Sequence, residues 1–323
     1  MNILITGANG FLGTTLVRQA LASRISFRAT DLHRSPVISG IVYEPSDITK
    51  PFTLTPLLDG VTDVIHTAGL AHVFDDSQAQ KAFFNAINVT GTVNMINAAF
   101  IAGVQHFVLI SSVSVYGPFT LGICDEDLSC HPAGLYALSK HMAERGAQEI
   151  AKRTGMALTI LRLATLYGEG DPGNVGRLVR TLDWGRFLWI GNGSNRKSLL
   201  YKGDAARACM AVAERPALGI NIYNVSSAAC TMREIVDGIA DALGKRPLPV
   251  QVPASLALFL SRHLSRIPSR RMAGLHQTVK KWLAEDVYDN RRFEEAYGFQ
   301  TKTSLKDGLK REVDWYRHNT EIY

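Results

Sequence analysis

The stretch MNILITGANGFLG at residues 1–13 decides the fold, because three glycines follow directly on a short apolar run. The largely apolar and β-branched residues 2–6 predict a buried strand, and apolar side chains with helical spacing follow the glycines. At such a joint Gly7 permits a tight turn, Gly10 lets the backbone approach a ligand, and Gly13 lets the helix pack close to the sheet. The helix N-terminus then offers free N–H groups and a partial positive charge, which suit a pyrophosphate.

An acidic residue ends the second predicted strand, about 20 residues beyond the glycines. Residues 26–35 read SFRATDLHRS, and the carboxylate of Asp31 can accept both hydroxyls of an adenosine ribose, which a 2′-phosphate would prevent. We therefore expect NAD as the cofactor. Arg34 lies close by and offers a partner for a 2′-phosphate, so NADP stays open, and a role of Asp31 as a helix cap or surface acid is the alternative.

Strand and helix patterns alternate through the first half of the 323-residue chain. The strand patterns cover residues 3–6, 27–30, 41–43, 63–66, 106–111, 157–162 and, later, 221–225. Helical patterns cover residues 11–22, 78–102 and 134–153. This order predicts an α/β fold with a doubly wound parallel sheet that helices cover on both faces.

The chain is longer than one compact core requires, so we expect two unequal domains. Residues 1–170, with a return segment at 199–228, are expected to form a dinucleotide-binding domain. Residues 171–198, rich in Gly, Asn and Arg, leave the sheet. Together with residues 229–323 they are expected to form a smaller, discontinuous substrate-binding lobe.

The composition is that of an ordinary globular protein, with 46% hydrophobic and 20% charged residues. No apolar run is long enough to span a membrane, and Met1 leads straight into a predicted core strand rather than a signal peptide. The apolar residues 255–260, which basic residues follow, predict a packed helix of the small lobe rather than a membrane-surface helix. We therefore expect a cytoplasmic protein without a membrane partner.

The formal net charge is +6, and basic residues concentrate at 261–271 and 302–311. These segments carry no nucleic-acid recognition motif, so we expect no nucleic-acid partner. A solvated basic face and arginines that face a diphosphate substrate both explain the excess. The four cysteines fit no zinc or redox spacing, which predicts free thiols and no metal site.

The segment HFVLISSVSVYG (106–117) ends a predicted strand in a serine cluster. Ligands of open parallel sheets bind beyond the carboxyl ends of the strands. We therefore expect Ser111, Ser112 and Ser114 to lie where the chemistry occurs.

The segment LYALSKHMAE (135–144) places Tyr136 and Lys140 on one face of a predicted helix, because they are four residues apart. A free tyrosine is a poor base, since its pKa is about 10. A nearby ammonium and an oxidised nicotinamide favour the phenolate and lower that pKa. Tyr136 would then remove a hydroxyl proton while hydride leaves for the nicotinamide, and Ser112 would hold the same oxygen by a hydrogen bond. A packed tyrosine and a solvated lysine are the alternative.

The sequence resembles the extended short-chain dehydrogenase/reductase superfamily, specifically its nucleotide-sugar epimerases and dehydratases. The resemblance covers essentially the whole chain and rests on TGANGFLG (6–13), SDIT (46–49), VIHTAGL (64–70), NVTGT (88–92), SSVSVYG (111–117), YALSK (136–140) and LRLATLYG (161–168). It implies that Ser112, Tyr136 and Lys140 are catalytic. The residues that it implies for NAD binding are Gly7, Gly10, Phe11, Leu12, Gly13, Asp31, Asp47, Ile48, Thr67, Ala68, Gly69, Tyr136 and Lys140.

Three departures from the family pattern narrow the activity. Sugar 4,6-dehydratases carry an Asp-Glu pair after the catalytic hydroxyl residue, and this chain has Val113 and Ser114 there, so we expect no dehydration. Many 4-epimerases read LRPxNVYG, and here Leu163 replaces the Pro and Thr165 replaces the Asn that touches the sugar diphosphate. Ala71 stands where some UDP-galactose epimerases have a lysine.

Four other segments look like one bacterial branch that makes UDP-N-acetylhexosamine precursors of surface polysaccharide. They are AHV (71–73), GNVGRLVR (173–180), GSNRKSLLY (193–201) and VPASLALFLSR (252–262). The resemblance places the substrate near Ser112, Thr165, Asn174, Arg177, Arg196 and Lys197, of which the last two would hold its diphosphate. Solvated loop residues are the alternative for the last four.

The expected function is an NAD-dependent nucleotide-sugar 4-epimerase that acts on a UDP-hexose or UDP-N-acetylhexosamine through a transient 4-keto intermediate. The alternatives are an NAD(P)-dependent UDP-4-keto-sugar reductase and a catalytically silent NAD-sensing protein, which has no use for the complete set of Ser112, Tyr136 and Lys140. We also expect a homodimer built from the helices at 88–103 and 134–153, because both carry more apolar positions than one buried face requires.

Overall fold

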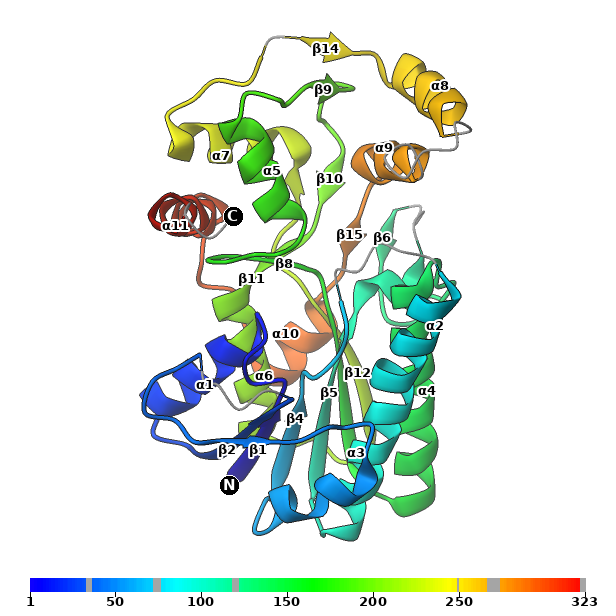
Figure 1. The fold of residues 1–323 in the computed structure, drawn as a ribbon, viewed down its shortest axis with the longest axis vertical. Helices are drawn as coiled ribbons and strands as arrows, with labels where there is room; N and C mark the ends of the chain where they lie inside the picture. Colours follow the sequence, from blue (N-terminus) through cyan, green and yellow to red (C-terminus); the bar gives the residue numbers. More distant parts are fainter. Residues whose placement is uncertain (33–36, 72–76, 118–121, 249, 266–273, 320–323) are drawn as a thin grey trace.

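Seven parallel strands form the central sheet of the computed structural model (Figure 1). The structure describes residues 1–32, 37–71, 77–117, 122–248, 250–265 and 274–319. The sheet strands are β1 (Asn2–Thr6), β2 (Ser26–Asp31), β3 (Tyr43–Pro45), β4 (Asp63–His66), β5 (His106–Ser112), β7 (Ala157–Leu163) and β12 (Ile220–Val225). Their order is β12-β7-β5-β4-β1-β2-β3, so the chain moves outward from β1 in both directions. The prediction of a doubly wound α/β fold is confirmed.

Eleven α-helices lie in the part of the chain that the structure describes. They are α1 (Gly13–Ala22), α2 (Gln78–Phe84), α3 (Thr92–Ile101), α4 (Leu135–Thr154), α5 (Asn174–Asp183), α6 (Lys202–Glu214), α7 (Met232–Leu243), α8 (Ala254–Leu264), α9 (Leu275–Leu283), α10 (Arg291–Tyr297) and α11 (Leu305–His318). Among them α1, α3, α4, α6 and α10 pack against the two faces of the sheet. Because strand side chains alternate between faces, Ile3 and Ile5 enter a core with α1, α6 and α10, whereas Leu4 enters a second core with α3 and α4.

A smaller lobe lies beyond the carboxyl ends of the sheet strands (Figure 1). Its own core gathers side chains of α5, α7 and α11 around Phe187 and Trp189. Short strands connect and brace the lobe: β6 (Ile123–Cys124), β8 (Thr165–Tyr167), β9 (Trp189–Ile190), β10 (Arg196–Lys197), β11 (Leu199–Tyr201), β13 (Cys230–Thr231), β14 (Gln251–Val252) and β15 (Val287–Tyr288). They pair as β8 with β11, β9 with β14, β10 with β13 and β6 with β15. The carboxyl ends of the sheet strands therefore face a second lobe, which positions a site between them.

Two predicted elements differ from the structure. The strand predicted at 41–43 lies at Tyr43–Pro45, because pairing with the end of β2 sets its position. The helical pattern predicted over 78–102 is confirmed as one helical run, but its middle is a π-helical segment at Asn85–Gly91 between α2 and α3. A π turn inserts an extra residue into the helix, and such turns occur at functional sites.

Candidate active site

The glycine loop leaves the carboxyl end of β1 between the two directions in which the sheet is built, where open α/β sheets bind ligands. Gly7 has a φ of +66°, and a Cβ there would lie 2.7 Å from the backbone nitrogen of Ala68. A side chain at Gly13 would collide with the carbonyl oxygen of Gly7. The N–H of Gly10 donates to that same oxygen at 2.9 Å. The loop is thus a tight cradle at the start of α1, and its shape fits a pyrophosphate.

Asp31 stands beside this cradle at the end of β2. Its Oδ2 accepts a hydrogen bond from the N–H of Asn9 at 3.0 Å, and its Oδ1 accepts one from the N–H of Leu32 at 2.8 Å. The carboxylate therefore holds the glycine loop next to the strand end, at the position where a dinucleotide would present its ribose. Arg34, the candidate partner of a 2′-phosphate, lies outside the described residues.

The loop after β4 forms the other wall of the cradle. The Thr67 hydroxyl donates to the carbonyl oxygen of Thr6 at 2.6 Å, and the N–H of Ala68 donates to the Thr6 hydroxyl at 3.2 Å. A Cβ at Gly69 would lie 3.1 Å from Oδ1 of Asn88 and 4.0 Å from Nζ of Lys140. These residues join the glycine loop to the helix that carries the predicted catalytic lysine.

Of the other residues predicted for the cofactor, Ile48 lies beside the π-helical segment and Asp47 directly precedes Ile48 in the chain. The Asp47 Oδ1 accepts hydrogen bonds from the N–H of Thr49 at 3.0 Å and from its hydroxyl at 2.6 Å, and the hydroxyl bond leads in lowering the pKa of Asp47. The Ile48 side chain fills the space next to Gly91, where a Cβ would lie 2.6 Å from its Cδ1. The contact of Asp47 and Ile48 with an adenine stays a prediction.

Ser112, Tyr136 and Lys140 gather at the carboxyl end of β5. The buried Lys140 ammonium donates to the carbonyl oxygen of Ile110 at 2.5 Å, two residues before Ser112. Burial lowers the pKa of Lys140 to about 8, although the negative charge of Glu144 raises it. Burial raises the pKa of Tyr136, and a hydrogen bond with Ser112 opposes that shift. The phenol is therefore protonated at neutral pH until further positive charge is brought to the site.

Asn88 is a site residue that the sequence analysis did not single out. Its side-chain amide donates to the Leu70 carbonyl oxygen at 3.0 Å and to the Ser139 hydroxyl at 2.9 Å, and its Oδ1 accepts from the N–H of Leu70 at 2.6 Å. The Ser139 hydroxyl in turn donates to the carbonyl oxygen of Tyr136 at 2.8 Å. Asn88 thus joins the loop after β4 to the first turn of α4. The one sequence feature that pointed to Asn88 was the motif NVTGT (88–92), which belongs to the resemblance.

A buried ion pair joins helix α4 to the sheet strands β5 and β7. The Arg162 guanidinium donates to both carboxylate oxygens of Glu144, at 2.7 and 3.1 Å, and the Ser111 hydroxyl donates to this carboxylate at 2.5 Å. Glu144 follows Tyr136 and Lys140 at a spacing of four residues, so α4 carries all three on one face. Ser111 therefore belongs to a buried network, and Ser112 is the serine beside the phenol.

The predicted substrate residues lie in the small lobe and its connections. Thr165 begins β8, and Asn174 and Arg177 are exposed on the first turns of α5. On β10, Arg196 pairs with Glu285 at 3.1 Å and Lys197 pairs with Asp286 at 2.5 Å. Both cations thus have carboxylate partners 89 residues away in the sequence. The Arg196 pair is half-exposed on both sides, so its net contribution to stability is small.

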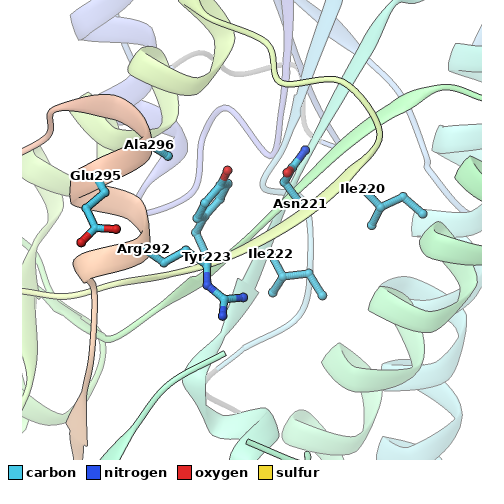
Figure 2. Close-up of a pocket in the computed structure, with 7 residues that line it drawn as sticks. All are labelled: Ile220, Asn221, Ile222, Tyr223, Arg292, Glu295 and Ala296. Carbon is cyan, nitrogen blue, oxygen red and sulfur yellow. The ribbon is translucent and has the colours of Figure 1, made fainter. Parts of the chain in front are cut away.

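A hollow of about 450 Å³ lies at the free edge of the sheet (Figure 2). Its lining comes from β12 and α10: Ile220, Asn221, Ile222, Tyr223, Arg292, Glu295 and Ala296. None of these residues belongs to the predicted cofactor, catalytic or substrate set. Among the described residues no group of His, Cys, Asp or Glu side chains is placed to hold a metal ion. The glycine cradle and the end of β5 are therefore the candidate active site.

The fold and the site together define a dinucleotide-dependent oxidoreductase. The glycine cradle fits a pyrophosphate, and Ser112, Tyr136 and Lys140 lie at the strand ends where such a sheet performs chemistry. The chain belongs to the NAD-dependent epimerase/dehydratase family, whose model matches residues 3–226. It is an NAD-dependent enzyme, and the prediction of NAD as its cofactor is confirmed.

Individual relatives match between 78% and 99% of the chain. The N-acetyl-α-D-glucosaminyl-diphospho-ditrans,octacis-undecaprenol 4-epimerase of Escherichia coli O157:H7 is 29% identical over 97% of this chain and 95% of that protein. The UDP-glucose 4-epimerase of Vibrio cholerae is 32% identical over 78% of this chain and 79% of that protein. The structure of MoeE5 in complex with UDP-glucose and NAD matches with a TM-score of 0.80 and 27% identity, over 99% of this chain and 100% of that chain.

Proposed function

We propose that the protein is a 4-epimerase of a UDP-hexose or UDP-N-acetylhexosamine and works through a transient 4-keto sugar. One observation carries this proposal: Ser112, Tyr136 and Lys140 are assembled, while Val113 and Ser114 stand where dehydratases of the family carry an acid and a base. Such a site can remove and return a hydroxyl proton, but it lacks the acid and base residues that dehydratases use to eliminate water. We therefore infer that it oxidises and then reduces the same carbon. The 4-epimerases among its relatives support the same reaction.

In this proposal different residues bind the cofactor, move the proton of the C4 hydroxyl and hold its oxygen. NAD, when bound, supplies an acceptor and donor of hydride. The glycine cradle and Asp31 would hold its pyrophosphate and ribose. The Tyr136 phenolate takes the C4 hydroxyl proton and later returns a proton to the reduced oxygen, and Ser112 donates a hydrogen bond to that oxygen. Because burial raises the pKa of Tyr136, the base form depends on the positive charges of Lys140 and of the oxidised cofactor.

An epimerase must let the 4-keto sugar ring rotate, so that its other face meets the cofactor, while the diphosphate stays bound. We assign that anchor to Arg196, because its half-exposed pair with Glu285 can open at little cost when a diphosphate arrives. Lys197 is more deeply buried and also donates to the Lys281 carbonyl oxygen at 2.7 Å. We therefore assign Lys197 chiefly to bracing β10 and Arg196 to the substrate. Thr165, Asn174 and Arg177 are the other proposed contacts.

A one-way UDP-4-keto-sugar reductase is the second candidate, because Thr165 replaces the Asn of many 4-epimerases. The two reactions differ in their need for reductant. An epimerase recycles its cofactor within each turnover, whereas a reductase consumes one NADH or NADPH per product. Asp31 beside the glycine loop favours NAD and so favours the epimerase.

The experiment is a panel of sugar nucleotides incubated with the purified enzyme without added reductant, with the products identified by NMR. The panel includes UDP-glucose, UDP-N-acetylglucosamine and N-acetylglucosamine carried on undecaprenyl diphosphate, since the E. coli relative is named for the last. The proposal predicts a C4 epimer of at least one UDP-sugar. Product only from a 4-keto sugar with added NADH would establish the reductase instead.

We also propose that the enzyme is a homodimer in the cytoplasm. Leu138 and Met142 on α4 are 40% and 43% exposed, and Phe100 and Ile101 at the end of α3 are also exposed. The spacing of Leu138 and Met142 puts both on one face of α4, which supports a bundle of α3 and α4 from two subunits.

The four cysteines are free thiols, which supports a reducing compartment.

A further inference from the structure

The helix α8 packs through one narrow face only. Ala257 and Ser261 are buried, and the Ser261 hydroxyl lies 3.0 Å from Nδ1 of His276 on α9. The prediction of a packed helix over 255–260 therefore holds for one side alone. The exposed apolar side chains of α8 are Leu256, Phe259, Leu260 and Leu264, with 46%, 60%, 45% and 38% of their surface accessible.

These four side chains form a single stripe. Their spacing of three, four and eight residues from the first places them on one side of the helix, next to the face that carries the buried Ala257 and Ser261. Helix α8 lies with β14 at the end of the small lobe that is farthest from the central sheet, and α9 lies between α8 and the sheet (Figure 1). The stripe is therefore remote from the glycine cradle, and the reaction proposed above gives it no role.

Arginine, lysine and histidine side chains border the stripe. Arg262 and His263 of α8 and His276 and Lys280 of α9 line a groove of about 750 Å³ whose apolar walls are Leu258 and Phe259. Lys281 on the next position of α9 is exposed. We name the four exposed apolar residues of α8, together with Arg262, Lys280 and Lys281, the tip surface.

The surrounding sequence has an extreme charge. Residues 245–284 contain eight Lys and Arg residues and no Asp or Glu. Without this segment the formal net charge of +6 would become −2, so the basic excess of the protein resides here. An apolar stripe within a wholly cationic segment is complementary to an anionic surface that also has an apolar interior.

We propose that the tip surface docks on the surface of an anionic phospholipid bilayer. The exposed Leu and Phe side chains enter the boundary between headgroups and acyl chains, and Arg262, Lys280 and Lys281 contact lipid phosphates. The helix lies in the plane of the interface, and none of the described helices is long and apolar enough to cross the bilayer. This inference goes beyond the proposed reaction and does not rest on it.

Two other occupants fit the tip surface less well. A second copy docked through the same surface would bring two cationic segments together and would lack any carboxylates to pair with them. A nucleic acid would satisfy the cations but would leave the stripe of leucines in water. A bilayer satisfies both features at once.

Co-sedimentation with extruded vesicles tests the proposal without any measurement of activity. Vesicles of phosphatidylglycerol and phosphatidylcholine should bind the full-length protein, and vesicles of phosphatidylcholine alone should bind it at least about tenfold more weakly. Raising the salt to about 0.5 M should weaken the binding to the anionic vesicles, since the Debye length shortens. Equal binding to the two kinds of vesicle, or binding to neither, would overturn the proposal.

Variants separate the apolar and the cationic contributions. The double substitution Leu256→Ser, Phe259→Ser should reduce binding to the anionic vesicles at least about tenfold, and Arg262→Glu should do the same. Leu218→Ser removes a leucine that is 93% exposed outside the tip surface and should bind as the wild type does. A circular-dichroism melt shows that each variant is folded, and the double Ser variant is then informative because Leu256 and Phe259 are 46% and 60% exposed and contribute little to the core.

Two results would reassign the tip surface. Binding of duplex DNA that Arg262→Glu removes and the double Ser variant leaves unchanged, with no binding to vesicles, would assign it to nucleic acid. A dimer in light scattering that the double Ser variant converts to a monomer, again without vesicle binding, would assign it to a second copy. Either result overturns the membrane proposal, and neither bears on the epimerase reaction.

Discussion

The substitution Glu144→Ala should be one of the most destabilising in the protein. Glu144 is fully buried and Arg162 is 4% exposed, and two hydrogen bonds of 2.7 and 3.1 Å join them. The change leaves a buried guanidinium without its carboxylate, which costs about 3–5 kcal/mol of the free energy of unfolding. Glu144→Gln keeps the shape but removes the charge, so we expect a smaller loss of about 1.5–3 kcal/mol.

The assay is denaturant unfolding at neutral pH, with and without NAD. Replacing both partners, as Glu144→Leu with Arg162→Met, removes the buried charges together and should recover most of the loss. Glu149→Ala on the exposed side of α4 is the matched control and should lie within about 0.5 kcal/mol of the wild type. A Glu144→Ala protein that unfolds within about 1 kcal/mol of the wild type would refute the reasoning, because the ion pair would then not hold α4 in place.

Four further predictions concern the site and the assembly. Tyr136→Phe should reduce turnover about 10²–10⁴-fold in steady-state assays while NAD titrations stay unchanged, and near wild-type turnover with NAD bound would mean that the phenol is not the base. Burial lowers the pKa of Lys140 from 10.5 to about 8, so without NAD the folded protein loses this proton before the unfolded chain does. The free energy of unfolding relative to Lys140→Met should therefore rise between about pH 8 and pH 10.5, and a pH-independent difference would contradict this. Asp31→Asn should weaken NADH binding and reduce the preference over NADPH, whereas a wild type that binds NADPH about tenfold more tightly than NADH would remove the role of Asp31. Met142→Glu should convert the dimer to a monomer in light scattering at micromolar concentration, with Leu218→Glu as the unaffected control, and a monomeric wild type would exclude the dimer.

The sheet and the glycine loop could be predicted because local patterns determine them. Strands such as Asp63–His66 are short and fully buried, and the β-branched apolar residues at their centre, here Val64 and Ile65, indicate a buried strand. The π-helical segment could not be predicted, because it turns Asn88 toward Leu70 and Ser139, and the second of these lies 51 residues away. The spacing of apolar residues does not predict a polar contact between residues so far apart in the sequence.

The candidate site also has a part that local sequence patterns predict and a part that they do not. Tyr136 and Lys140 share a helix face, so their spacing alone predicts that the two side chains lie close together. Arg196 and Lys197 lie on a strand of two residues, and their carboxylate partners come from a segment 89 residues farther along. The exposure of Leu256 and Phe259 likewise depends on which elements pack against α8, which the helical pattern does not specify.

The most direct test of the account is proton NMR of the reaction in D₂O, with the purified enzyme, a UDP-sugar that it accepts and no added reductant. Because hydride leaves C4 and returns to it without contact with solvent, the C4 epimer should accumulate to the same equilibrium from either epimer, with protium retained at C4. The account would be contradicted if no UDP-sugar of the panel gave an epimer, or if the epimer carried deuterium at C4.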